Sequence, residues 1–172
     1  KKARYYYILA QLHQQDKNHK QAQKYYKLVL KSNPEYVMTF NAKMNLARSL
    51  ESGNKDSKKM KEKLLKMTKD DKNKEYLDQI YFTLAEMDMN NKDTISAIEN
   101  YTLSAVNSIQ NNSQKAISFL KLGVIEFERS LYRSSKLYYD STLFYMDSDF
   151  RMYEEASEKH EILSELINNL DV

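Results

Sequence analysis

The residues that could do chemistry are few and lie far apart in the chain. Three histidines, His13, His19 and His160, occur without the carboxylate or histidine spacing that would hold a metal ion. His160-Glu161 begins like the helical signature of zinc proteases, but Ser164 stands where the second histidine is needed. We therefore expect His13 and His160 to lie on helix surfaces, and we predict no metal site.

Other catalytic arrangements also find no support. The chain has no cysteine, which excludes disulfide bonds, thiolate metal sites and a cysteine nucleophile. Its two glycines, Gly53 and Gly123, are isolated, so no glycine-rich loop is present to hold a phosphate group. Asp147-Ser148-Asp149 could bind a cation, but it precedes a helical pattern, and we favour helix capping. We predict that the protein is not an enzyme and uses no cofactor.

Tyrosine pairs and a lysine-rich stretch raise the alternative of nucleic-acid binding. Tyr25-Tyr26 and Tyr138-Tyr139 could stack on bases, and the nine lysines of residues 55–74 could contact phosphates. Against this, one tyrosine of each pair, Tyr26 and Tyr139, is at a position that we expect to be buried in the core. Residues 140–172 hold nine acidic residues and two basic ones. We interpret the lysines as a solvated helix face and expect no nucleic-acid partner.

The composition predicts an all-α fold. The 172 residues include two glycines and one proline, and they are rich in Leu, Met, Ala, Lys, Glu and Gln, which lose little conformational freedom in helices. The longest apolar runs, such as residues 116–124, are interrupted by Ser118 and Lys121. None approaches the roughly 20 residues of a membrane-spanning helix. We therefore expect no membrane insertion by this segment.

Small and aromatic residues recur along the chain with the period of a helix pair. An aromatic residue recurs at the same position of each unit, at Tyr6, Phe40, Tyr81 and Phe119, and these residues are 34, 41 and 38 positions apart. Longer loops cost little closure entropy, so such a period can stretch. The other residues of the pattern in the first unit are Leu9, Ala10, Ala22, Tyr26 and Val29, and Pro34 ends that unit. In the third unit they are Leu84, Ala85, Ala97 and Tyr101, and in the fourth Leu122, Gly123, Tyr132, Ser135 and Tyr139. The second unit is weaker, with Met44, Ala47, Met60, Leu64 and Met67.

This spacing resembles the tetratricopeptide repeat, two antiparallel helices in about 34 residues. The resemblance implies a right-handed solenoid of about four helix-turn-helix repeats, over residues 3–34, 37–69, 76–107 and 113–147. An irregular bundle of eight amphipathic helices is the alternative. Ala10, Ala85 and Gly123 each lie four residues after the recurring aromatic residue. This favours the stacked repeat, because a bundle does not require small residues at that fixed spacing.

A further helix is predicted over residues 149–170, with Asp149 as its N-cap. We interpret it as a capping helix, because the end of a solenoid needs a polar outer face, or as the first helix of another repeat. We expect residues 1–172 to form a single domain. The first residues, Lys1-Lys2-Ala3-Arg4, contain neither an initiator methionine nor a signal-peptide core. We therefore expect a segment of a longer protein.

In tetratricopeptide solenoids the first helix of each repeat lines a concave binding face. The motif positions directed inward there are Arg4, Tyr7, Gln11, Asn41, Asn45, Arg48, Gln79, Phe82, Glu86, Ile117, Leu120, Val124 and Phe127. The last four form an apolar stripe on one helix face. We expect it to be covered either by the protein's own C-terminal helix or a following repeat, or by a partner segment with Phe82 at its edge. Cochaperone repeats clamp a carboxylate with Lys and Asn, but Tyr7 and Gln11 stand at those positions here.

Several stretches resemble one narrower group. They are Ala3-Arg4-Tyr5 with Ile8-Leu9-Ala10-Gln11-Leu12; Asn41-Ala42-Lys43; Asp70-Asp71-Lys72-Asn73-Lys74-Glu75-Tyr76-Leu77-Asp78-Gln79-Ile80-Tyr81; and Tyr138-Tyr139-Asp140-Ser141. Together they resemble the tetratricopeptide lipoproteins of Bacteroidota gliding motility and type IX secretion, the PorW/SprE type. The resemblance implies a lipoprotein on the periplasmic side of the outer membrane that links the secretion channel to motor components. Its lipid anchor would lie outside this segment.

The sequence therefore leaves two classes of protein-binding function open. One is a scaffold in a cell-envelope secretion and gliding machinery, with secretion-machinery components as partners. The alternative is a soluble adaptor or cochaperone, cytoplasmic in location, that binds peptide segments in its concave groove.

Overall fold

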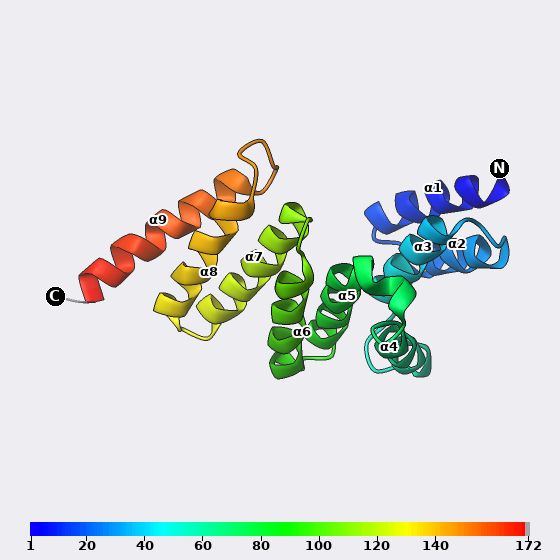
Figure 1. Ribbon diagram of the computed structural model, residues 1–172, viewed down its shortest axis with the longest axis horizontal. Coiled ribbons are helices and arrows are strands. Elements are labelled where there is room, and N and C mark those ends of the chain that lie inside the picture. The colour runs from blue at the N-terminus through cyan, green and yellow to red at the C-terminus, as the bar shows by residue number, and fades with distance from the viewer. Residues whose placement is uncertain (171–172) are drawn as a thin grey trace. The chain divides into compact units, whose positions relative to one another are not determined.

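The computed structural model describes residues 1–170, and all regular structure in that range is helical (Figure 1). This confirms the all-α class predicted from composition. No helix in the described range is both long enough and apolar enough to cross a membrane. The helices are α1 (Lys2–Gln15), α2 (His19–Lys31), α3 (Tyr36–Ser49), α4 (Lys55–Met67), the 3-10 helix η1 (Asp71–Tyr76), α5 (Leu77–Asn90), α6 (Thr94–Asn107), α7 (Asn112–Glu128), α8 (Tyr132–Tyr145) and α9 (Tyr153–Leu170).

The chain divides into two compact units of opposite charge. Unit 1 is Lys1–Lys69 and contains α1 to α4, and unit 2 is Asp70–Val172 and contains η1 and α5 to α9. Unit 1 has 17 basic and 5 acidic residues, a net charge of +12, whereas unit 2 has 10 basic and 19 acidic residues, a net charge of −9. The single continuous domain expected from the repeat stays a prediction.

Three helix pairs, α1–α2, α5–α6 and α7–α8, share the same turn. In each pair a three-residue connection joins the helices, and its middle residue has a left-handed backbone although it is not glycine. The next N–H then donates to the carbonyl five residues earlier. The left-handed residues are Lys17, Lys92 and Ser130, with φ of 56°, 62° and 61°. The hydrogen bonds are Asn18 to His13, Asp93 to Asp88 and Leu131 to Glu126, with N···O distances of 2.8, 2.9 and 2.9 Å.

Each of these pairs also buries a small residue of its first helix and a tyrosine 16 positions later. The pairs of residues are Ala10 and Tyr26, Ala85 and Tyr101, and Gly123 and Tyr139. A Cβ added at Gly123 would lie 3.0 Å from two ring carbons of Tyr139, so the helices approach too closely there for a larger side chain. Burial of these positions agrees with the prediction from their spacing.

The pair α3 and α4 is built differently, because the two helices make little contact with each other. Along α4 only Ser57 and Leu64 are buried, and lysines occupy much of the remaining surface. So narrow an apolar stripe is too small to hold a helix pair together. This agrees with the weak pattern found for the second unit of the repeat.

The C-terminal helix α9 begins at Tyr153, so the predicted start at 149 and the N-cap at Asp149 are wrong. The N–H of Phe150 donates to the carbonyl of Asp147 over 2.9 Å, and that of Tyr153 donates to Phe150 over 2.8 Å. Residues 149–152, which the sequence pattern assigned to the helix, therefore lie in turns. The helix packs on α8.

A hydrogen bond between two side chains, Asp140 of α8 and His160 of α9, joins this helix pair. It links His160 Nε2 and Asp140 Oδ1 over 2.6 Å. Partial burial raises the pKa of the Asp140 carboxyl, but hydrogen bonds from Lys136 and His160 outweigh burial and lower that pKa below its ordinary value. The ionised carboxylate therefore helps to hold α9 on α8.

Candidate binding groove

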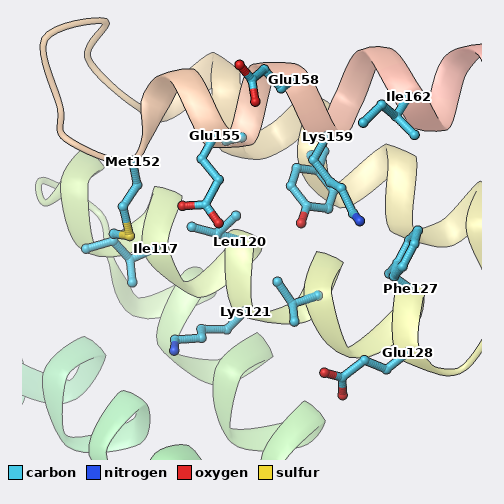
Figure 2. Close-up of a pocket in the computed structure, with 13 residues that line it drawn as sticks. Ile117, Leu120, Lys121, Phe127, Glu128, Met152, Glu155, Glu158, Lys159 and Ile162 are labelled. Carbon is cyan, nitrogen blue, oxygen red and sulfur yellow. The ribbon is translucent and has the colours of Figure 1, made fainter.

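The apolar stripe on α7 lines a cavity within unit 2. Ile117, Leu120, Val124 and Phe127 are spaced by three, four and three residues, which places them on one helical face. All four line a cavity of about 560 Å³ (Figure 2). The structure therefore brings together the four apolar residues that the sequence singled out.

The opposite wall of this cavity comes from α9 and the turn before it. The residues contributed by that wall are Met152, Glu155, Ala156, Glu158, Lys159 and Ile162. Tyr139 of α8 lies between the two walls, and it forms a buried cluster with Ala156 and Leu163 of α9. We call the cavity between α7 and α9, with Tyr139 at its base, the α7–α9 groove.

The protein's own C-terminal helix covers part of the stripe and leaves part of it open. Leu120 and Phe127 are half-buried against the cluster of Tyr139, Ala156 and Leu163. Val124 on α7 is 38% exposed, and Ile162 on α9 is 56% exposed. Coverage of the stripe by the protein's own C-terminal helix, the first of the two expected outcomes, is thus partial.

Charged residues line the groove, and one of them, Lys159, lies over the aromatic ring of Phe127. Its lining includes Glu128, Glu155 and Glu158, with Lys121 and Lys159 as the cations. Lys159 Nζ lies 3.7 Å from the centroid of the Phe127 ring. In Figure 2 the carboxylate of Glu155 points toward Leu120, and the Lys121 side chain points away from the groove. Within the described residues, none of the three carboxylates forms a salt bridge.

Tyr139 provides a polar group at the base of the groove. Burial, and then the negative charge of Glu155, raise the pKa of the Tyr139 hydroxyl above its ordinary value. The hydroxyl is therefore protonated at neutral pH and able to donate a hydrogen bond. No described residue hydrogen-bonds to it.

The predicted residues on α5 do not join this groove. Phe82 is 6% exposed and packs edge-on against Tyr101, with ring centroids 5.3 Å apart. Its assignment to the edge of a binding surface is therefore wrong, because the ring is part of the unit 2 core. Gln79 and Glu86 are half-buried, and neither lines the α7–α9 groove.

The predicted residues of unit 1 form a polar surface instead. Asn45 Nδ2 donates to the Tyr7 hydroxyl over 3.0 Å, and Arg48 Nη1 donates to Asn45 Oδ1 over 3.5 Å. Burial raises the pKa of the Tyr7 hydroxyl, although the Asn45 hydrogen bond and the Arg48 charge oppose this. Asn41 is half-buried, whereas Arg4 and Gln11 are exposed. The predicted groove residues thus divide into a polar set in unit 1, the apolar stripe on α7, and three residues of α5 that do not line the groove.

The sequence predicts the C-terminal helix as one possible cover of the stripe, but it identifies no residue of the α9 wall. Ile162 and the charged residues Glu155, Glu158 and Lys159 line this wall, and none of them is among the predicted site residues. No short-range spacing indicates that this helix meets the stripe on α7, because the meeting depends on the turns at residues 147–153.

Neither a scan against models of known protein families nor a search of curated proteins finds a match to this chain.

Proposed function

We propose that this protein is a non-catalytic scaffold that binds other proteins, and that the α7–α9 groove receives an apolar segment of a partner. The observation that carries the proposal is the stripe on α7, which opens into a cavity of about 560 Å³ with Val124 still 38% exposed. Apolar residues grouped on an accessible surface mark interaction sites more often than single exposed ones do.

We further propose that the helix pairs form a tetratricopeptide-like solenoid within each unit. The repeated turn and the repeated small-residue and tyrosine register support this, as do the contacts of α2 with α3, α6 with α7 and α8 with α9. In such a solenoid α7 and α9 are the first helices of successive repeats, which line the concave binding surface. The groove then lies where repeat proteins bind their partners.

The dimensions of the groove suit a short peptide segment. Its volume falls in the range of roughly 300–1,000 Å³ that is usual for ligand sites. From Ile117 to Phe127 the stripe covers ten steps along a helix, which is about 15 Å at 1.5 Å per residue. A partner segment of about three helical turns, or of four to five extended residues, matches this length.

The proposal is tested by a substitution at the open part of the stripe. Val124→Glu should abolish partner capture and leave the free energy of unfolding within about 0.5 kcal/mol of wild type, because the side chain is partly exposed. Ile95 on α6 is 76% exposed and does not line the groove, so Ile95→Glu is the matched control. Photo-cross-linkers at 124 and 95 in the native host, read by mass spectrometry, should capture the partner at 124 only.

A different result would contradict the assignment. If Val124→Glu lowers stability by several kcal/mol, the stripe is internal core and not a binding surface. If capture is equal at positions 124 and 95, the contact is not specific to the groove.

For the cellular setting, we propose a component of a bacterial secretion and gliding machinery of the type IX kind, at the periplasmic side of the outer membrane. The support is the resemblance of the stretches quoted above, such as residues 70–81 and 138–141. The alternative is a soluble adaptor or cochaperone with the same groove. Fractionation of the native host distinguishes them, since only the first should sediment with outer membranes and cross-link to channel components.

A further inference from the structure

We propose that the segment bound in the α7–α9 groove is basic, with lysine or arginine beside its apolar residues, and that Lys159 occupies the position of a ligand cation on Phe127 until the segment binds. This inference rests on the proposed function and names the chemistry of the partner.

Three carboxylates around the apolar surface of the groove are left without a cationic partner in the described part of the chain. Glu128 on α7, and Glu155 and Glu158 on α9, are exposed to water and form no salt bridge with any described residue. A segment that fills the groove removes water from these carboxylates, and an unpaired charge is costly to desolvate. Cationic side chains on the segment remove that penalty, whereas acidic side chains add repulsion.

The geometry of Phe127 and Lys159 also favours a cationic ligand. The Phe127 ring is held edge-on by Tyr132, with ring centroids 5.5 Å apart and planes at 61°, so one face of the ring has a defined orientation. Lys159 Nζ lies 3.7 Å from the ring centroid, well inside the roughly 6 Å limit for a cation–π contact. The groove therefore contains a formed site for a cation on an aromatic face.

Lys159 can leave this ring without losing a partner. It lies four residues after Glu155 on α9, which is the helical spacing at which Glu and Lys side chains meet. Release of Lys159 toward Glu155 exposes the ring to a ligand guanidinium or ammonium group. Glu128 and Glu158 then remain to pair with further basic residues of the segment.

The charge of unit 2 favours the same partner at longer range. Its net charge of −9 attracts a cationic segment and repels an acidic one, in contrast with the +12 of unit 1. A partner of this chemistry is therefore directed to the unit that holds the groove.

The test uses the full chain and three synthetic amphipathic peptides of about eleven residues, three helical turns. They share leucines at one helical face and have lysine, glutamine or glutamate at all other positions. Fluorescence anisotropy should show binding of the lysine peptide about tenfold tighter than that of the glutamate peptide, with the glutamine peptide between them. Absence of lysine-peptide binding, or equal affinity for all three, overturns the inference.

Two substitutions separate groove binding from general charge attraction. Val124→Glu adds negative charge, so it should strengthen non-specific attraction of the lysine peptide but weaken binding inside the groove, and we expect weaker binding. Lys159→Gln uncovers the ring and should tighten binding about threefold. Lys115, whose Nζ lies 4.9 Å from the Tyr145 ring outside the groove, gives the matched control Lys115→Gln, which should leave affinity unchanged.

The outcomes also distinguish this inference from the proposed function. If all three peptides bind equally and Val124→Glu abolishes binding of each, the groove is a binding site but its preference for basic segments is wrong. If Val124→Glu alters no peptide, the proposed function fails with it. If Lys159→Gln does not tighten binding, Lys159 does not occupy the ligand position. Concentration-dependent dimerisation that Val124→Glu abolishes would identify a second copy as the occupant and overturn the assignment to a partner.

Discussion

The helix pairs α1–α2 and α7–α8 share a core register but present different surfaces. Six residues before, three before and one after the buried small residue, α7 has Ile117, Leu120 and Val124. At the corresponding positions α1 has Arg4, Tyr7 and Gln11. The Tyr7 hydroxyl accepts a hydrogen bond from Asn45, whereas the α7 residues line an open apolar cavity.

This contrast shows that one helix-pair scaffold supports two kinds of surface. The buried positions must satisfy close packing, which limits them to small residues and a tyrosine. The surface positions are released from that constraint, so they can follow function. On the polar surface Asn45 hydrogen-bonds to both Tyr7 and Arg48, whereas an apolar surface gains free energy when it is covered.

The largest expected effect tests whether the two scaffolds are equivalent. Tyr26→Ala and Tyr139→Ala each remove a buried aromatic ring, and we expect each to lower the free energy of unfolding by about 3–5 kcal/mol. Urea denaturation followed by circular dichroism measures this. Tyr5 is 67% exposed, so Tyr5→Ala should change stability by less than about 0.5 kcal/mol. A loss below about 1 kcal/mol at only one of the two buried tyrosines would show that the two helix pairs are not equivalent.

The next effect tests the close approach of the helices. Gly123→Leu should lower stability by roughly 1–3 kcal/mol, because its side chain would meet the Tyr139 ring. Ala10→Leu, at the same register in α1, should have a similar effect. Ser113 is exposed in the first turn of α7, and Ser113→Leu is the control that should be nearly neutral. Equal denaturation midpoints for Gly123→Leu and Ser113→Leu would argue against the shared register.

A smaller effect separates the two buried tyrosines by their hydroxyl groups. Tyr26 donates to Gln14 Oε1 over 2.6 Å, whereas no described residue bonds to the Tyr139 hydroxyl. Tyr26→Phe should therefore cost about 1 kcal/mol of stability, and Tyr139→Phe less than half of that. Thermal denaturation of both variants at neutral pH checks this, and equal losses would contradict it.

The same tyrosine predicts a pH dependence. Burial, together with the neighbouring Tyr7, raises the pKa of Tyr26 to about 12, above its ordinary value near 10. A pKa raised by folding stabilises the folded state fully below pH 10, and that stabilisation is lost as pH rises through 12. Wild type should lose stability between about pH 10 and 12, and Tyr26→Phe should lose less of it. Parallel curves for the two proteins would exclude Tyr26 as the source.

The smallest expected effect concerns the shared turn. Lys17 in unit 1 and Ser130 in unit 2 have left-handed backbones that disfavour side chains. Lys17→Gly and Ser130→Gly should each raise stability by about 0.5–1 kcal/mol, net of the entropy that glycine adds to the unfolded chain. Lys24→Gly in the middle of α2 should instead lower it by about 1 kcal/mol. A stabilisation in one unit only would show that the two turns differ.

The helical class and the buried register follow from the sequence alone. These properties depend on short-range spacing. Helical periodicity decides which residues share a face. Ala10 and Tyr26, like Gly123 and Tyr139, are 16 residues apart, a separation that one helix pair spans. The four members of the apolar stripe on α7 were found for the same reason.

Which elements pack against each helix face depends on contacts between residues far apart in the chain. Periodicity placed Phe82 on the same helical face as the groove positions, but packing against Tyr101 buried it in the unit 2 core. The turns at residues 147–153 delayed the start of α9, and packing of Ala156 and Leu163 on Tyr139 then brought Lys159 to Phe127. Contacts between distant elements depend on loop geometry and on competition for the same buried surface, and neither is encoded in the spacing of a single helix.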